Sequence, residues 1–146
     1  AENNIVADVL APPRGYYLSL REEPLTDAVI QRNIFYSMGK DTVFIDELPP
    51  AGNGRTTEDR RGRALARAKD ADTDYNMYYS TVDPTLGTAI LERQQADGVD
   101  THSLAVDPLF MDPVNGDFRL KPDSPALKLG FVPIDLSKVG LRETEP

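Results

Sequence analysis

Two adjacent carboxylates, Asp46 and Glu47, follow a short apolar run that is typical of a strand. Paired carboxylates beside a groove are what glycoside hydrolysis uses, one as the acid and the other as the base or nucleophile. Because neighbouring residues of a strand point to opposite faces, these two are not expected to be each other's partner. We therefore treat either one as a candidate that would act with a carboxylate elsewhere. The alternative is a solvated turn before the prolines that follow.

His102 is the one histidine of the chain. Imidazole is the side chain best suited to proton transfer near neutral pH, so His102 is the third catalytic candidate. It lies within Asp100-Thr101-His102-Ser103, a polar stretch immediately before the segment that begins at Asp107.

Aromatic and basic residues supply the candidates for substrate binding. Tyrosine rings stack on sugar rings and add a hydroxyl for hydrogen bonding, although in each adjacent pair one ring is expected to point inward. The segment 51–70 is rich in arginine, which suits contact with an acidic glycan or an acidic protein surface; a solvated surface loop is the alternative. The residues singled out are Tyr16, Tyr17, Arg60, Arg61 and Arg63.

No metal site and no organic cofactor are predicted. Several aspartates could supply oxygen ligands to Ca²⁺, but their spacing matches no EF-hand loop, and Asx turns or solubility explain them as well. These are Asp70, Asp72, Asp74, Asp97 and Asp100. The chain has no cysteine, which excludes disulfides and thiolate sites. Phosphate-binding glycine loops and dinucleotide fingerprints are absent from the sequence.

Composition narrows the class of protein. The 146 residues carry a formal net charge of −8, which argues against nucleic acid as a partner because phosphate binding needs a basic surface. No apolar run approaches the ~20 residues of a membrane span. The twelve prolines and ten glycines favour short strands separated by turns over a helical bundle.

Three stretches share one pattern, an Asn followed by an aliphatic residue, and they begin at Asn4, Asn33 and Asn76. Their spacing suits solenoid repeats of ~20–50 residues once residues 49–70 are taken as an insertion, part loop and part helix. Asn tolerates the positive φ of a tight bend, and stacked copies hydrogen-bond amide to amide. The pattern predicts these asparagines at successive bends. The residues that follow them, Ile5, Ile34 and Met77, are predicted to form one interior column.

The region from Asp107 onward is predicted to be a cover for the end of such a solenoid. Residues 112–116 form a turn signal between two apolar runs, which predicts a strand pair at 109–111 and 117–120. Ser124 is a good N-cap, Pro125 suits the first helical position, and Gly130 suits a left-handed C-terminal cap. We expect residues 1–106 to form the last solenoid coils and residues 107–146 the capping segment.

A family resemblance adds to this pattern. The stretch DTHSLAVDPLFMDPVNGDFRLKPDSPALKLGF, preceded by DYNMYY, resembles the C-terminal region of bacterial right-handed parallel β-helix proteins of the pectate-lyase-like superfamily. The resemblance implies an all-β, right-handed parallel β-helix and a structural role for His102, whose imidazole would bond to loop backbone. Relatives of this kind include lyases that bind Ca²⁺. Because such proteins are longer, it also implies further coils before Ala1, on the same polypeptide or on a separate chain.

The function expected from the resemblance is that of the C-terminal part of a secreted or periplasmic enzyme that processes polysaccharide, either a glycoside hydrolase or a polysaccharide lyase. Two alternatives stay open. One is a noncatalytic module that binds glycan or protein, and the other is a structural solenoid end.

Overall fold

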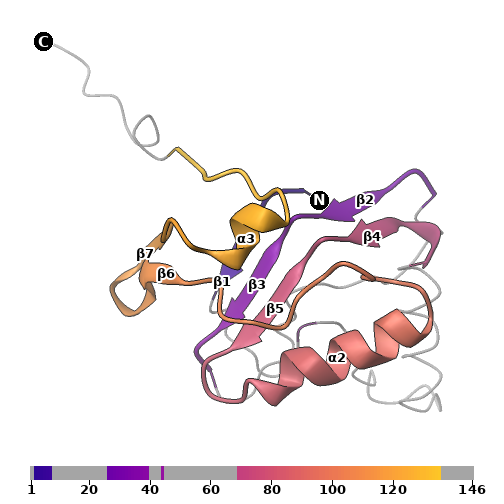
Figure 1. Cartoon of the computed structure of the whole chain (residues 1–146), viewed down its shortest axis with the longest axis horizontal. Coiled ribbons are helices and arrows are strands. Elements are labelled where there is room, and N and C mark those ends of the chain that lie inside the picture. The colour runs from indigo at the N-terminus through magenta and orange to yellow at the C-terminus, as the bar shows by residue number, and fades with distance from the viewer. Residues whose placement is uncertain (1, 8–25, 40–43, 45–68, 136–146) are drawn as a thin grey trace, which may run out of the picture.

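The structure is a computed structural model that describes residues 2–7, 26–39, 44 and 69–135 (Figure 1). Its elements, in chain order, are β1 (Ile5–Ala7), β2 (Val29–Gln31), β3 (Ile34–Ser37), β4 (Asp72–Asp74), β5 (Met77–Ser80), α2 (Thr85–Ala96), β6 (Phe110–Asp112), η1 (Pro113–Asn115), β7 (Asp117–Leu120) and α3 (Pro125–Lys128).

The strands form small sheets. Parallel strands in the order β1-β3-β5 make a three-stranded sheet, β2 and β4 make a two-stranded parallel sheet, and β6 and β7 form an antiparallel hairpin. In the three-stranded sheet Ile34 pairs with Ile5 on one side and with Met77 on the other. The register therefore aligns the three Asn-headed stretches, as their shared pattern predicts.

The bends between sheets use a residue that the sequence did not mark. The asparagine at the head of each stretch was predicted to adopt the positive φ. The residue before it does so instead: Asn3 at 55°, Arg32 at 54° and Tyr75 at 58°. A left-handed residue turns the chain sharply, so a two-residue link suffices between β2 and β3 and between β4 and β5. The asparagines are left with side chains directed along the stack of bends.

The three-stranded sheet is buried on both faces. One face carries Phe35 and Tyr78, which pack with Phe44 and with Leu91 of α2. The other face carries Ile34 and Met77, with the half-buried Ile5, beneath the C-terminal segment. The predicted column of aliphatic residues does form, because strand residues of equal register share a face. It lies under the C-terminal segment and on the face away from α2.

The C-terminal segment has the predicted local structure. The hairpin β6–β7 encloses the turn at η1, and the Ser124 hydroxyl accepts a hydrogen bond from the Ala126 N–H at the start of α3. Gly130 follows α3 with a φ of 83°, as a left-handed cap requires. Phe110, Ala126 and Phe131 then pack against the sheet, so this segment covers a sheet face.

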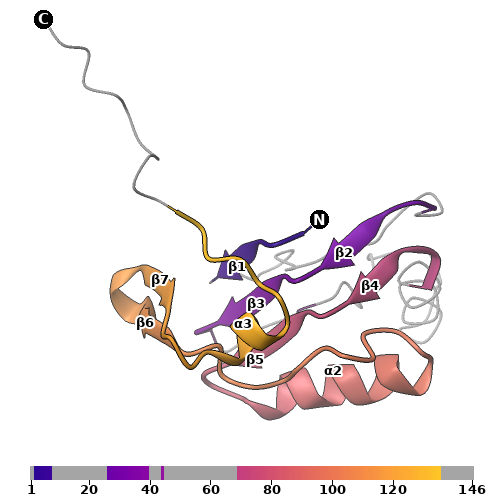
Figure 2. The ribbon, with the colours of Figure 1, turned by 45° about the horizontal axis from the view of Figure 1, so that its top comes forward.

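Helix α2 was not predicted, and it changes the architecture. It runs alongside β5 in both views, while the hairpin β6–β7 stands apart from it (Figures 1 and 2). A Cβ at Gly87 would lie 2.3 Å from the Tyr78 carbonyl oxygen, so glycine permits this close approach of helix and strand. Gly98, with a φ of 78°, turns the chain back after the helix.

The predicted fold class, an all-β right-handed parallel β-helix, is wrong. The described residues form a mixed structure of small parallel and antiparallel sheets with two α-helices, and these do not close a solenoid. The physical reason is that the Asn-headed pattern specifies a bend and a strand register, and nothing more. Residues 85–96 place Leu86, Ile90 and Leu91 on one helical face, which satisfies the same core without another strand.

Candidate functional site

A ladder of polar side chains joins the bends. Asn4 donates from its backbone and its side chain to Asn33 Oδ1, at 3.2 and 3.0 Å. Asn33 donates in the same two ways to Asn76 Oδ1, both at 3.0 Å. The Asn76 N–H in turn donates to Ser103 Oγ at 2.7 Å, so Ser103 acts as a fourth rung. The predicted amide-to-amide stacking of the three asparagines is therefore confirmed.

The ladder ends at a buried carboxylate. Asp100 is fully buried and accepts hydrogen bonds from Asn76 Nδ2 (2.9 Å), the Tyr78 hydroxyl (2.9 Å) and Ser103 Oγ. Burial raises the pKa of the Asp100 carboxyl above its ordinary value, and the hydrogen bonds from Ser103, Asn76 and Tyr78 oppose that rise. Burial and the nearby Asp100 charge raise the pKa of Tyr78 well above 10. Asp100 is therefore a structural hydrogen-bond acceptor in the protein interior.

Outside the ladder, three side chains stack along the bend. The Tyr75 and His102 rings lie 5.0 Å apart between centroids, at an interplanar angle of 7°. The Arg32 guanidinium lies 5.8 Å from the centre of the Tyr75 ring and also pairs with Glu2 at 3.0 Å. Each of the three is the residue immediately before a rung. The regular stacking of rungs therefore brings a cation, a phenol and an imidazole together.

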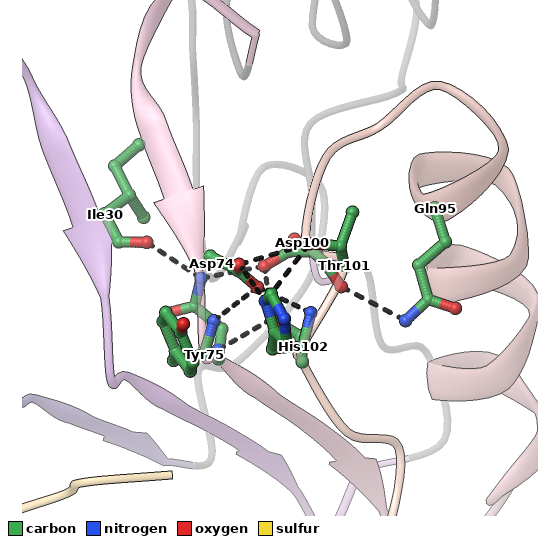
Figure 3. Close-up of polar contacts among 9 residues, drawn as sticks. Ile30, Asp74, Tyr75, Gln95, Asp100, Thr101 and His102 are labelled. Carbon is green, nitrogen blue, oxygen red and sulfur yellow. Dashed lines mark hydrogen bonds and ion pairs between the residues drawn. The ribbon is translucent and has the colours of Figure 1, made fainter.

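His102 is held by Asp74, the last residue of β4 (Figure 3). His102 Nδ1 lies 2.7 Å from Asp74 Oδ2, and the imidazole side chain is 62% exposed while Asp74 is 14% exposed. Asp74 also accepts from the backbone N–H groups of Tyr75 (2.8 Å) and His102 (2.7 Å) and from the Thr101 hydroxyl (3.2 Å). Burial alone would raise the pKa of Asp74, but the hydrogen bonds from His102 and Tyr75 hold it below its ordinary value.

This geometry fixes what the imidazole can do. An ionised carboxylate only accepts hydrogen bonds, so in its contact with Asp74 the Nδ1 atom carries the proton. In the neutral imidazole, Nε2 then bears the lone pair, and no described residue is hydrogen-bonded to it. A carboxylate that orients an imidazole with a free basic nitrogen is the base-and-orienter pair of general-base sites. The pair is thus equipped to accept a proton from a ligand.

All of the other predicted site residues lie outside the described residues. These are Asp46, Glu47, Tyr16, Tyr17, Arg60, Arg61 and Arg63, and their assignments stay predictions. His102 is described, and the sequence singled it out without showing its partner.

Three of the five aspartates considered for Ca²⁺ have other roles. Asp97 pairs with Lys69 at 3.0 Å, Asp74 holds His102, and Asp100 faces the interior. Across the described ranges, no group of three acidic or histidine side chains is placed to hold a metal ion.

Sequence reasoning missed Ser103 as a rung, and with it the stack of Arg32, Tyr75 and His102. The signal was present: Ser103-Leu104 repeats the polar-then-aliphatic pattern of Asn76-Met77, and Leu104 forms a parallel bridge with Met77. Ser replaces Asn in this copy, so a search for asparagine alone passes over it.

Comparison of the chain with protein-family models, with curated proteins and with solved structures gave no match. Among the helices described, none has the length and apolar character needed to cross a membrane.

Proposed function

We propose that this chain contributes a general base to an enzyme acting on acidic polysaccharide, with His102 abstracting a proton from a uronic acid unit. The observation that carries the proposal is the exposed imidazole whose Nδ1 is held 2.7 Å from Asp74, leaving Nε2 as a base. Asp74 is already occupied by its hydrogen-bond donors. The base at this site is therefore the imidazole, which favours elimination over hydrolysis by paired carboxylates.

The elimination balances with the groups present. Nε2 takes the proton from C5, next to the uronate carboxylate, and the C–H electron pair forms the C4–C5 double bond. The C4–O bond breaks, and the leaving glycosidic oxygen gains a proton from water or from the Tyr75 hydroxyl. Asp74 stabilises the imidazolium that forms, as a buried carboxylate orients and balances a catalytic histidine.

A cation near the base supports an acidic substrate. Arg32 lies against the far face of Tyr75, and a guanidinium pairs well with a carboxylate. Glu2 shares that charge, since it pairs with Arg32 at 3.0 Å. The proposal extends to Arg60, Arg61 and Arg63 as further contacts for an acidic glycan, with Tyr16 and Tyr17 as stacking surfaces.

The test compares His102→Asn with the parent chain on polygalacturonate, following the ultraviolet absorbance of the unsaturated product. The Asn amide nitrogen can replace Nδ1 as donor to Asp74, but it supplies no base. We expect the rate to fall about 100-fold or more while the unfolding temperature is unchanged. Unchanged product formation in His102→Asn, or no product from the parent chain across uronate polymers, would overturn the proposal.

A structural role is the rival reading, and one observation favours it. Asp74 accepts hydrogen bonds from two backbone N–H groups as well as from His102 and Thr101, so it ties the loop after α2 to the bend after β4. His102→Ala breaks the imidazole contact, whereas His102→Asn preserves it. Under the structural role, only His102→Ala lowers the free energy of unfolding, and neither variant affects a reaction.

A further inference from the structure

The ladder has a direction. Asn33 Oδ1 receives donors from Asn4, Asn76 Oδ1 receives donors from Asn33, and Ser103 Oγ receives the Asn76 N–H. Every acceptor thus serves the rung nearer the N-terminus. The backbone bonds beside the ladder run the opposite way, because the Ile34 and Met77 N–H groups donate to the carbonyls of Asn4 and Asn33 at 2.8 Å.

At Asn4 this series stops with an acceptor left over. Asn4 Nδ2 donates to Asn33 and to the Glu2 carbonyl, but no described residue donates to Asn4 Oδ1. Among the described strands, β1 lies at one edge of its sheet, and its Asn4 carbonyl faces β3. Alternation along a parallel strand then directs the N–H and C=O of Ile5 to the opposite edge. Asn4 is exposed and Ile5 only half-buried, whereas Asn33 and Ile34 are each 1% exposed.

We propose that this edge is a docking site for an extended strand of a partner polypeptide, aligned parallel to β1 and carrying an Asn directly before an aliphatic residue. The partner's Asn would donate its N–H and its amide to Asn4 Oδ1, as Asn4 does to Asn33. Its Asn carbonyl would accept from the Ile5 N–H, as the Asn4 carbonyl accepts from Ile34. Its aliphatic side chain would extend the column of Ile5, Ile34 and Met77.

The geometry selects against a symmetric dimer at this edge. Two copies joined β1 to β1 about a two-fold axis would run antiparallel. That arrangement points each Asn4 acceptor away from the other copy's donors, so the ladder would not continue. Addition of a parallel strand satisfies the side-chain acceptor and the backbone together, which is how strand addition to a sheet edge achieves register.

The experiment titrates the isotopically labelled chain with a synthetic peptide that copies residues 31–38, QRNIFYSM, because this stretch already stacks on a rung. The control peptide has Asp in place of its Asn, which removes the amide donor and adds a charge against Asn4 Oδ1. We expect the amide shifts of residues 2–7 to respond to the first peptide, and the control to bind about fivefold more weakly or worse.

Two chain variants locate the contact. Ile5→Pro removes the outward backbone N–H. Ile5→Ala truncates the side chain but keeps that N–H. We expect Ile5→Pro to bind the peptide at least about fivefold more weakly than Ile5→Ala. Absence of binding, equal binding of the two peptides, or equal binding by the two variants would each overturn the proposal. Peptide binding by a single parent chain, with no change in its self-association, excludes the second copy as the occupant.

Discussion

The two ends of the ladder differ in how they stop. At Ser103 the last rung is closed by Asp100, which is buried and accepts from three side chains beneath helix α2. At Asn4 the first rung is exposed and its oxygen has no donor among the described residues. A periodic hydrogen-bond array therefore needs a residue of different chemistry to end it. A carboxylate, which only accepts, ends the array where donors arrive.

Removing the acceptor at the Ser103 end of the ladder, Asp100, should cause the largest loss of stability. Asp100→Ala leaves the donors of Asn76, Tyr78 and Ser103 unpaired in the interior, and we expect the free energy of unfolding to fall by about 3 kcal/mol. Asp100→Asn is the matched control: it keeps one acceptor, offers a donor to the Tyr78 oxygen and removes the buried charge, so the loss should be about 1 kcal/mol. Urea unfolding measures both. Equal losses would contradict the acceptor role.

The helix over the closed end gives the next largest effect. In Gly87→Ala the new Cβ would lie 2.3 Å from the Tyr78 carbonyl oxygen, so α2 must shift from β5. We expect a loss of about 2 kcal/mol in the free energy of unfolding, although alanine is the better helix former. Thr88→Ala, at the neighbouring exposed position, should be neutral or slightly stabilising. A stable Gly87→Ala would show that the helix does not need this close approach.

The exposed end rung, Asn4, and the buried interior rung beside it, Asn33, should differ in how much they contribute to stability. Asn33→Ala removes a buried acceptor from Asn4 and a donor from Asn76, and we expect a loss of about 1.5 kcal/mol. Asn4→Ala removes an exposed rung whose partners water can replace, so its loss should stay near 0.5 kcal/mol. Thermal unfolding of the two variants gives the difference. The same loss at both positions would mean that burial does not determine the value of a rung.

The contributions of Asp74 and Asp100 to the free energy of unfolding should change in opposite directions as the pH is lowered. The folded-state pKa of Asp74 is lowered, so its contribution to stability is present above its ordinary pKa of about 3.9 and is lost as the pH falls below that value. The folded-state pKa of Asp100 is raised, so stability declines as the pH rises from about 3.9 through the raised value. Unfolding of Asp74→Asn and Asp100→Asn between pH 2 and 6 should show the parent's two slopes removed one at a time.

Local patterns predicted the local structure. The Asn-aliphatic stretches became the bends before β3 and β5, and the polar cluster at 112–116 became the hairpin turn, because both depend on a few adjacent residues. Helix α2 escaped prediction since its first turn has no side-chain cap hydrogen bond and Gly87 weakens the helical signal. Glycine is needed there because of the close approach to the Tyr78 carbonyl, which belongs to another element, β5.

The candidate site depends on contacts that no local pattern contains. His102 was marked by residue type alone, but its partner Asp74 is 28 residues away and was considered for Ca²⁺. Likewise Asp100 resembles its exposed neighbours in sequence, and only the arrival of Tyr78 and Asn76 makes it a buried acceptor. The assembled ladder places Asp74 beside the His102 imidazole and buries Asp100 among interior side chains.

Asn3 forms a contact whose consequence concerns the order of folding. Its side chain grips the backbone of Val132, with Nδ2 donating to the carbonyl at 2.8 Å and Oδ1 accepting from the N–H at 2.6 Å, across 129 positions of the sequence. Contacts of such long range form late, because the loop they close must first lose its entropy. During synthesis on the ribosome, the contact between Asn3 and Val132 therefore cannot form until residue 132 has emerged. Chaperones and proteases therefore have access to Asn3 before Val132 is there to bind it.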